Sequence, residues 1–185
     1  MKIFLTGSTG FVGKRVLNDL LEKNYQVRCL ARQGSEQKLA SYQAKGVDVV
    51  HGNITDPGSL DGKLAGCDAV INLVGIIRSF PCKGITFEKM HHEGTANLIH
   101  AAQSQGVRRF LQMSSLGARQ NGKTPYLQTK YRAEECVRNS GLAYTIFRPS
   151  VIFGPGDSFV NLFANMLRRQ QFVPVVGNGK YQLQP

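Results

Sequence analysis

Three glycines stand three residues apart near the start of the chain, at Gly7, Gly10 and Gly13. The apolar run 2–6 before them has the pattern of a strand, and the segment after them has the apolar periodicity of a helix. Glycine lets a strand-to-helix turn be tight and lets its backbone approach a pyrophosphate, while the helix N-terminus offers unpaired N–H groups. The turn is therefore predicted to bind the diphosphate of a dinucleotide. The alternative is a glycine-rich turn without a ligand.

The residues at the end of the second predicted strand indicate which dinucleotide to expect. An acidic residue there suits the ribose 2′-OH of NAD, whereas an arginine suits the 2′-phosphate of NADP. This chain has Arg32 and Gln33, and its next acidic residue is Glu36. Because a guanidinium matches the geometry of a phosphate, the sequence favours NADP(H) over NAD(H), the alternative being a solvated Arg32.

Strand-like and helix-like segments alternate along the chain, which predicts βαβ units. The predicted strands are 2–6, 25–31, 47–52, 67–75, 108–115 and 142–148, and the predicted helices are 11–24, 35–45, a short one after a turn at 55–60, 85–105 and 125–139. The expected fold is α/β, a doubly wound parallel sheet (Rossmann fold) with helices on both faces. After Arg148 we expect a loop over 149–157, a helix over 158–170 and an incipient strand over 172–176.

Composition and charge narrow the class of protein. The chain has 23 Lys and Arg against 12 Asp and Glu, a net charge of +11. The basic residues are scattered and form no recognition motif, so a surface that favours anionic ligands is the preferred interpretation and nucleic-acid binding the weaker one. Without an apolar run of membrane-spanning length or a signal peptide, we expect a cytoplasmic protein, with a place at the periphery of a membrane complex left open. The cysteines and histidines show no metal-ligand spacing, so no metal site is expected.

Several stretches together resemble one known superfamily. TGSTGFVG at 6–13, YLQTK at 126–130 and RPSVIFGPGD at 148–157 resemble the extended, epimerase/dehydratase-like branch of the short-chain dehydrogenases/reductases. Within that branch, HHEGTANLIHAA at 91–102 and GVRRFLQMSS at 106–115 resemble the group related to the 39 kDa-type accessory subunit of respiratory complex I. Members of the group continue into a substrate-binding lobe. We therefore expect residues 1–185 to be a single NAD(P)-binding Rossmann domain in which 150–185 begin the substrate side, truncated before the C-terminal lobe.

The resemblance implies a catalytic set of Ser115, Tyr126 and Lys130. Tyr126 and Lys130 lie four residues apart, on one face of a helix, where an ammonium favours the phenolate. Tyr126 is then the general acid/base, Lys130 also reaches the nicotinamide ribose, and Ser115 bonds the substrate oxygen, with Ser114 as the alternative. Active relatives have Asn where His91 falls, which leaves the proton relay open because an imidazole can also shuttle protons.

The glycine turn, Arg32 and the resemblance together imply a larger set of cofactor-binding residues. Asn53 stands where many members of the superfamily have Asp. The full set is Gly7, Ser8, Thr9, Gly10, Phe11, Val12, Gly13, Arg32, Asn53, Ile54, Leu73, Val74, Gly75, Met113, Tyr126, Lys130 and Pro149.

Three functions are compatible with these residues. The first is an NAD(P)(H)-dependent oxidoreductase or epimerase/dehydratase that transfers a hydride to or from an unidentified small-molecule substrate. The second is a non-catalytic cofactor-binding accessory or assembly factor of a membrane respiratory or photosynthetic complex. The third, a redox-sensing regulator, ranks last because the relatives of that kind commonly lack the intact Tyr-Lys pair. A homodimer through the helices after the fourth and fifth strands is also left open.

Overall fold

The computed structural model describes residues 1–157, 159–169 and 183–184, and the chain divides into two units, Met1–Arg148 and Pro149–Pro185. The first unit contains a six-stranded, all-parallel sheet in the order β3-β2-β1-β4-β5-β6. Its strands are β1 (Lys2–Thr6), β2 (Gln26–Ala31), β3 (Asp48–His51), β4 (Ala69–Asn72), β5 (Arg109–Met113) and β6 (Ala143–Phe147). The predicted doubly wound Rossmann fold is confirmed.

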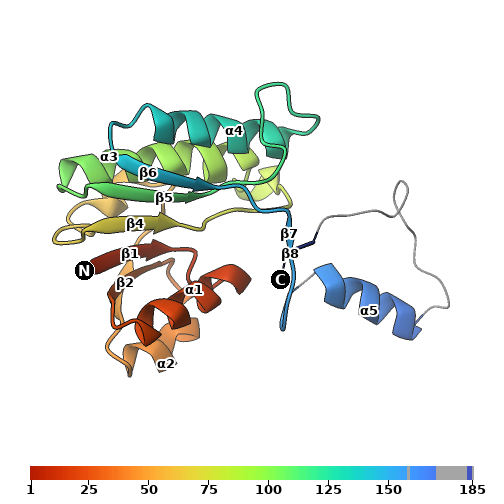
Figure 1. Cartoon of the computed structure of the whole chain (residues 1–185), viewed down its shortest axis with the longest axis horizontal. Coiled ribbons are helices and arrows are strands. Elements are labelled where there is room, and N and C mark those ends of the chain that lie inside the picture. Colours follow the sequence, from red (N-terminus) through yellow and green to blue (C-terminus); the bar gives the residue numbers. More distant parts are fainter. Residues whose placement is uncertain (158, 170–182, 185) are drawn as a thin grey trace. The chain divides into compact units, whose positions relative to one another are not determined.

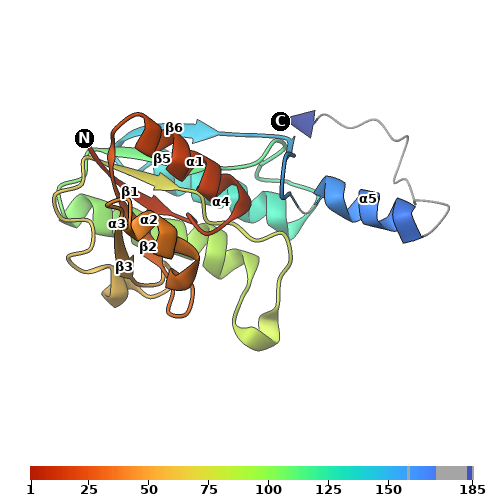
Figure 2. The same cartoon turned by 90° about the horizontal axis from the view of Figure 1, so that it is seen from below.

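Helices cover both faces of this sheet. One face carries α1 (Phe11–Glu22) and α2 (Ala40–Gln43), and the other carries α3 (Gly94–Ser104) and α4 (Pro125–Arg138) (Figure 1). Figure 2, seen from the side of α1 and α2, shows these two helices in front of the strands. Successive residues of β1 pack on opposite faces of the sheet: Phe4 lies in the core with α3 and α4, and Leu5 lies in the core with α1. Because both faces are covered, the residues in the middle of β1, Ile3–Leu5, are apolar and buried.

Several predicted elements are shorter or differently wound than the periodicity indicated. The predicted helix 35–45 is the 3₁₀ turn η1 (Glu36–Leu39) followed by the four residues of α2, and the turn at 55–60 contains the 3₁₀ turn η2 (Pro57–Leu60). The predicted strand 67–75 ends at Asn72, because the next residues leave the sheet toward a cavity described below.

The predicted helix 85–105 contains a π-helical segment. It begins with η4 (Glu88–Glu93), which is π-helical, and continues as α3. Between β4 and η4 lies a long excursion that includes the short turn η3 (Pro81–Lys83) and a bridge between Phe80 and Ile85 (Figure 2). A π-helical turn redirects side chains relative to the α-helix that follows it, and such turns are frequent at functional sites.

The second unit contains β7 (Val151–Ile152), α5 (Phe159–Arg169) and β8 (Leu183–Gln184), with β7 and β8 paired in parallel. The Asp157 carboxylate accepts a hydrogen bond from the backbone N–H of Val160 at 2.6 Å, which caps the start of α5. The helix predicted over 158–170 is therefore present, and the strand predicted over 172–176 lies outside the described residues. Among the helices that the structure describes, none combines the length and the apolar character needed to cross a membrane.

Candidate functional site

A cavity of about 320 Å³ lies where β1, β2 and β4 end at their carboxyl termini. In an open parallel sheet, ligands bind beyond this edge, at the place where the strand order reverses, and here β2 and β4 flank β1 on opposite sides. The lining residues are Thr6, Gly7, Thr9, Gly10, Leu30, Ala31, Arg32, Ser35, Gly52, Asn53, Ile54, Leu73, Val74, Gly75, Ile76, Arg78, Phe80, Ile85 and Met90.

Two of the three glycines in the first turn are required by close backbone contacts. Gly7 has a φ of +75°, and a Cβ there would lie 2.9 Å from the carbonyl carbon of Leu73. A Cβ on Gly13 would lie 2.0 Å from the Gly7 carbonyl oxygen, far inside van der Waals contact. The turn is therefore pressed against both the end of β4 and the first turn of α1, which any side chain would prevent.

The first turn of α1 faces this cavity without a competing negative charge. Gly10 is the N-cap residue, lines the cavity, and donates its N–H to the Gly7 carbonyl at 3.0 Å. The first turn of α1 contains no acidic residue. Unpaired N–H groups and the positive end of the helix dipole make such a terminus a binding site for an anion such as a diphosphate.

Two arginines add positive charge from opposite walls. Arg32 follows β2, and Arg78 belongs to the excursion after β4. Neither guanidinium forms a hydrogen bond or an ion pair with any residue that the structure describes, and no carboxylate lines the cavity within that part of the chain. A cavity with two uncompensated cations and a helix N-terminus favours a polyanionic ligand.

The structure brings many, but not all, of the predicted cofactor residues to this cavity. Those that line it are Gly7, Thr9, Gly10, Arg32, Asn53, Ile54, Leu73, Val74 and Gly75. Those of the first unit that do not line it are Ser8, Phe11, Val12, Gly13, Met113, Tyr126 and Lys130, while Pro149 belongs to the second unit. Ser8 is fully buried, and its hydroxyl lies beside the Cys29 thiol, whose pKa burial raises to about 11.

Some lining residues were missed by the sequence reasoning. Arg78, Phe80 and Ile85 come from the excursion after β4, which has no periodic pattern in the sequence. The available signal was a single cation, Arg78, shortly after the end of a predicted strand. That signal does not show that the chain folds back over the strand ends.

The predicted catalytic pair lies on α4, next to the cavity wall formed by Gly75. The helix begins at Pro125, and the Thr124 hydroxyl caps it by accepting the N–H of Leu127 at 3.3 Å. Lys130 is buried and donates from Nζ to the Met113 carbonyl at 3.1 Å. A Cβ on Gly75 would lie 3.0 Å from this Nζ, so the ammonium stands directly behind the cavity wall. Burial lowers the pKa of Lys130 to about 8, against the opposing effect of the Glu134 charge.

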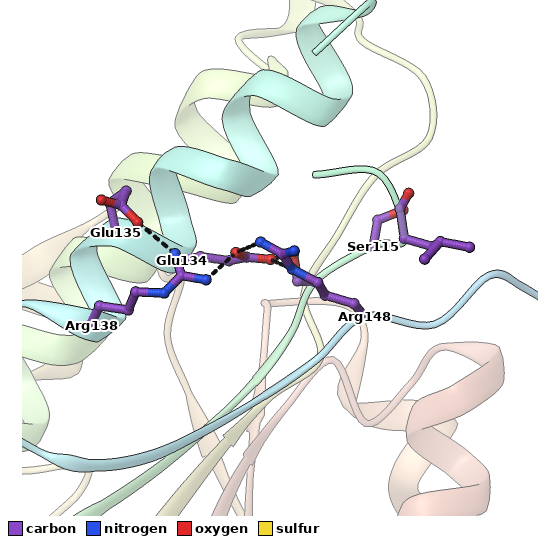
Figure 3. Close-up of polar contacts among 7 residues, drawn as sticks. Ser115, Glu134, Glu135, Arg138 and Arg148 are labelled. Carbon is purple, nitrogen blue, oxygen red and sulfur yellow. Dashed lines mark hydrogen bonds and ion pairs between the residues drawn. The ribbon is translucent and has the colours of Figure 1, made fainter. Parts of the chain in front are cut away.

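The two serines after β5 have different environments. The Ser114 hydroxyl is buried and donates to Glu134 Oε1 at 2.5 Å. The Ser115 side chain is half-buried, and among the described residues its hydroxyl bonds only to the neighbouring Leu116 carbonyl, at 3.4 Å. Figure 3 shows Ser115 outside the charged cluster around Glu134. Ser115, rather than Ser114, therefore has a hydroxyl available to a ligand.

His91 lies on η4 and joins helix α4, which carries Tyr126 and Lys130, to the segment after β4. Its Nε2 accepts the N–H of Ile76 at 3.1 Å, so Nδ1 carries the ring proton and donates it to the Thr129 hydroxyl at 3.0 Å. The imidazole edge packs against the Tyr126 ring, with 5.3 Å between ring centroids, and the other flank stacks on Phe87. Burial, reinforced by the charge of Lys130, lowers the pKa of His91 to about 3. His91 is therefore a neutral connector, and a proton on Nε2 would break its bond to Ile76.

Comparison with known proteins agrees with this geometry. The sequence model of a family described as NAD(P)H-binding matches residues 7–158, and the chain belongs to this family. Ceramide reductase of Caulobacter vibrioides is 29% identical, over 94% of this chain and 53% of that protein. A mitochondrial protein of Arabidopsis thaliana, NADH dehydrogenase [ubiquinone] 1 alpha subcomplex subunit 9, is 30% identical, over 97% of this chain and 45% of its own length. Photosystem II assembly factor Ycf39 of Guillardia theta is 28% identical, over 96% of this chain and 54% of that protein.

A solved structure extends the comparison to the epimerase/dehydratase branch. It is a double mutant of DesIV (dTDP-glucose 4,6-dehydratase) from Streptomyces venezuelae with NAD and DAU bound. It matches with a TM-score of 0.79 and 25% identity, over 97% of this chain and 66% of that one. The expected resemblance is thereby confirmed. The chain spans about half the length of the curated relatives it matches.

The contact between Gly13 and Gly7 can be tested by adding a methyl group. Gly13→Ala should destabilise the protein by about 1–3 kcal/mol, because the new Cβ overlaps the Gly7 carbonyl and opens the turn. The control is Gly58→Ala, where the nearest atom to the new Cβ lies 3.7 Å away. Urea unfolding measures stability, and nucleotide fluorescence measures dinucleotide binding, which should weaken only in Gly13→Ala. Equal behaviour of the two variants would contradict the packing argument.

The neutral state of His91 predicts how stability depends on pH. Its pKa is about 3 in the folded protein and 6.5 in the reference state, so the unfolded chain binds the extra proton first as the pH falls. The contribution of neutral His91 to the free energy of unfolding is fully present above pH 6.5. Below that pH it is lost at about 1.4 kcal/mol per pH unit. Between pH 7 and 5, the free energy of unfolding should therefore fall by about 2 kcal/mol more in the wild type than in His91→Asn.

Urea titrations at several pH values measure this difference. The control is His100→Asn, because His100 is exposed and should leave the wild-type slope unchanged. Parallel slopes for the wild type and His91→Asn would show that His91 is not held neutral by the fold.

Proposed function

We propose that this chain is the cofactor-binding part of an NADP(H)-dependent oxidoreductase or epimerase/dehydratase. The observation that carries the proposal is the cavity at the carboxyl edge of the sheet, which is lined by the glycine turn, a helix N-terminus and two arginines that have no partner within the described part of the chain. A dinucleotide with three phosphates is the polyanion that this arrangement suits. When bound, its nicotinamide supplies or accepts a hydride; all other steps belong to side chains of the protein.

The lining residues divide among the parts of the cofactor. The glycine turn and the start of α1 would hold the diphosphate, because the first N–H groups of a helix have no partner within the helix and glycine leaves the backbone uncovered. Arg32, with Ser35 close by in the same lining, would hold the 2′-phosphate. Asn53 and Ile54 would flank the adenine, on the β3 side of the cavity.

The residues beside Gly75 would transfer the proton to or from the substrate oxygen. Lys130 is mostly protonated at neutral pH and would bond the ribose hydroxyls of the cofactor. Tyr126 would then give or take the proton of the substrate hydroxyl or carbonyl, and Ser115 would donate a hydrogen bond to the same oxygen. Neutral His91 would hold the Tyr126 ring at its edge rather than carry protons.

The two arginines of the cavity should have different signatures. Arg32→Ala should weaken NADPH binding about tenfold and change NADH binding little, because only NADPH offers the 2′-phosphate. Arg78→Ala is the matched comparison from the opposite wall and should weaken both dinucleotides by the same factor. Titrations followed by nucleotide fluorescence give the dissociation constants. A wild-type preference for NADH, or an equal loss of both dinucleotides in Arg32→Ala, would overturn the assignment.

A second function is favoured by the relatives and by His91. Two of the relatives are named as a subunit of NADH dehydrogenase and as an assembly factor of photosystem II. Both ring nitrogens of His91 form hydrogen bonds within the protein, to Ile76 and to Thr129, so the histidine is not available to carry protons for an enzyme. A protein that holds NADP(H) without turnover, and serves a membrane complex, is the alternative proposal.

Kinetics of the full-length protein distinguish these two functions. With NADPH and a panel of ketones, an oxidoreductase should oxidise NADPH, and with NADP⁺ and a panel of nucleotide sugars, an epimerase or dehydratase should convert the sugar without net change of the cofactor. In either case Tyr126→Phe should lower the rate about 100-fold or more by removing the acid/base hydroxyl. Tyr131→Phe, on the same helix, is the control and should retain activity. Equal rates in the wild type and Tyr126→Phe would exclude the role of Tyr126. NADPH retained in equimolar amount without turnover would support the accessory function.

A further inference from the structure

A completely buried carboxylate lies one helical turn after Lys130. Glu134 is 0% exposed, and Figure 3 shows it between the guanidinium groups of Arg138 and Arg148. Arg148 binds it with two nitrogens, Nε at 2.8 Å and Nη2 at 2.5 Å. Arg138 adds a bond from Nη2 at 2.8 Å, and the Ser114 hydroxyl adds one at 2.5 Å. Both oxygens of the carboxylate are thus fully hydrogen-bonded, which is what a buried charge requires.

These bonds connect three separate elements of the first unit. Ser114 directly follows β5, Glu134 belongs to α4, and Arg148 directly follows β6. The backbone continues the connection, because the Ser114 N–H donates to the Phe147 carbonyl at 2.7 Å. One turn earlier on α4, Lys130 donates to the Met113 carbonyl. Helix α4 therefore forms hydrogen bonds with Met113 and Ser114, the two residues immediately before Ser115.

We propose that Glu134 is a positioning residue for the proposed catalytic site: it anchors the end of β5 next to Ser115 and places a negative charge one helical turn from Lys130. The inference rests on the proposed function, since it concerns the same Ser115, Tyr126 and Lys130. Removing one partner of such a buried, bidentate charge pair disturbs its surroundings more strongly than removing an exposed carboxylate. The Glu134 site is therefore expected to act on the neighbouring lysine and serine rather than only on general stability.

The charges around Lys130 give the direction of the effect. Glu134 on α4 is a negative group whose charge acts on Lys130, and neutral His91 on η4 is a titratable neighbour. Tyr126 precedes Lys130 by one turn on α4. Burial raises the pKa of Glu134, but the bonds from Arg148, Ser114 and Arg138 outweigh it and hold that pKa below its usual value. Glu134 thus stays ionised, and its charge opposes the loss of the proton from buried Lys130.

The experiment is a pH titration of NADPH binding between pH 6 and 10 at high ionic strength. In the wild type, affinity should fall about fivefold as Lys130 loses its proton near pH 8. In Glu134→Gln, which keeps the side-chain volume, the midpoint of this fall should move about one pH unit lower. Glu135→Gln is the matched control, because Glu135 is a half-buried carboxylate on the same helix that also binds Arg138, at 2.5 Å, but bonds to neither Ser114 nor Arg148 among the residues that the structure describes. It should titrate like the wild type.

Two further variants keep the test decisive. Glu134→Asp retains the charge but withdraws the carboxylate from Ser114, and its midpoint should fall between those of the wild type and Glu134→Gln; it carries the test alone if Glu134→Gln does not fold. Lys130→Met should remove the fall in affinity altogether. If the fall persists in Lys130→Met, the proposed role of Lys130 fails and this inference fails with it. If the fall depends on Lys130 but has the same midpoint in the Glu134 variants as in Glu135→Gln, only the role of Glu134 is overturned.

Discussion

The architecture of this site depends on a steric constraint, the close approach of three backbone segments at the first turn. The turn after β1 touches the end of β4 at Gly7 and the first turn of α1 at Gly13, and a Cβ at either position would lie within 3 Å of another backbone atom. Only with this contact can the N-terminus of α1 reach the edge of the sheet and line a cavity between β2 and β4. The anion-binding character of the cavity follows from the position of that helix.

Beneath the cavity, a buried polar network ties the central strands together. The Thr6 hydroxyl donates to Asn72 at 2.7 Å, and the Asn72 amide donates in turn to Gln112 at 2.9 Å. Thr6 and Asn72 end β1 and β4, and Gln112 is the last residue but one of β5. Because these side chains form hydrogen bonds with one another in the core, they hold the strand ends in a single register. The positions of the loops that follow the strands are fixed as a result.

The second half of the site balances charge against burial. Lys130 and Glu134 are both buried on α4, one turn apart, and each has bonds that compensate for lost solvent. His91, beside Lys130, is held neutral, so the positive charge beside the cavity wall at Gly75 is that of Lys130. A neutral imidazole is the state that burial next to an ammonium favours. His91 and Lys130 are therefore neighbours with different roles, since the neutral histidine connects structural elements and the lysine carries the charge.

What the sequence determined by itself was local. Periodicity identified the strands and helices of the first unit, and the glycine spacing identified the turn, because both are properties of consecutive residues. Other features came only from tertiary structure: Arg78 folding back over the strand ends, the π-helical turn that brings His91 against Ile76 and Thr129, and the junction of Ser114, Glu134 and Arg148. Each joins residues far apart in the chain, through contacts whose partners no local pattern specifies. Such contacts are decided by packing, which selects among many compatible pairings only when the whole sheet is assembled.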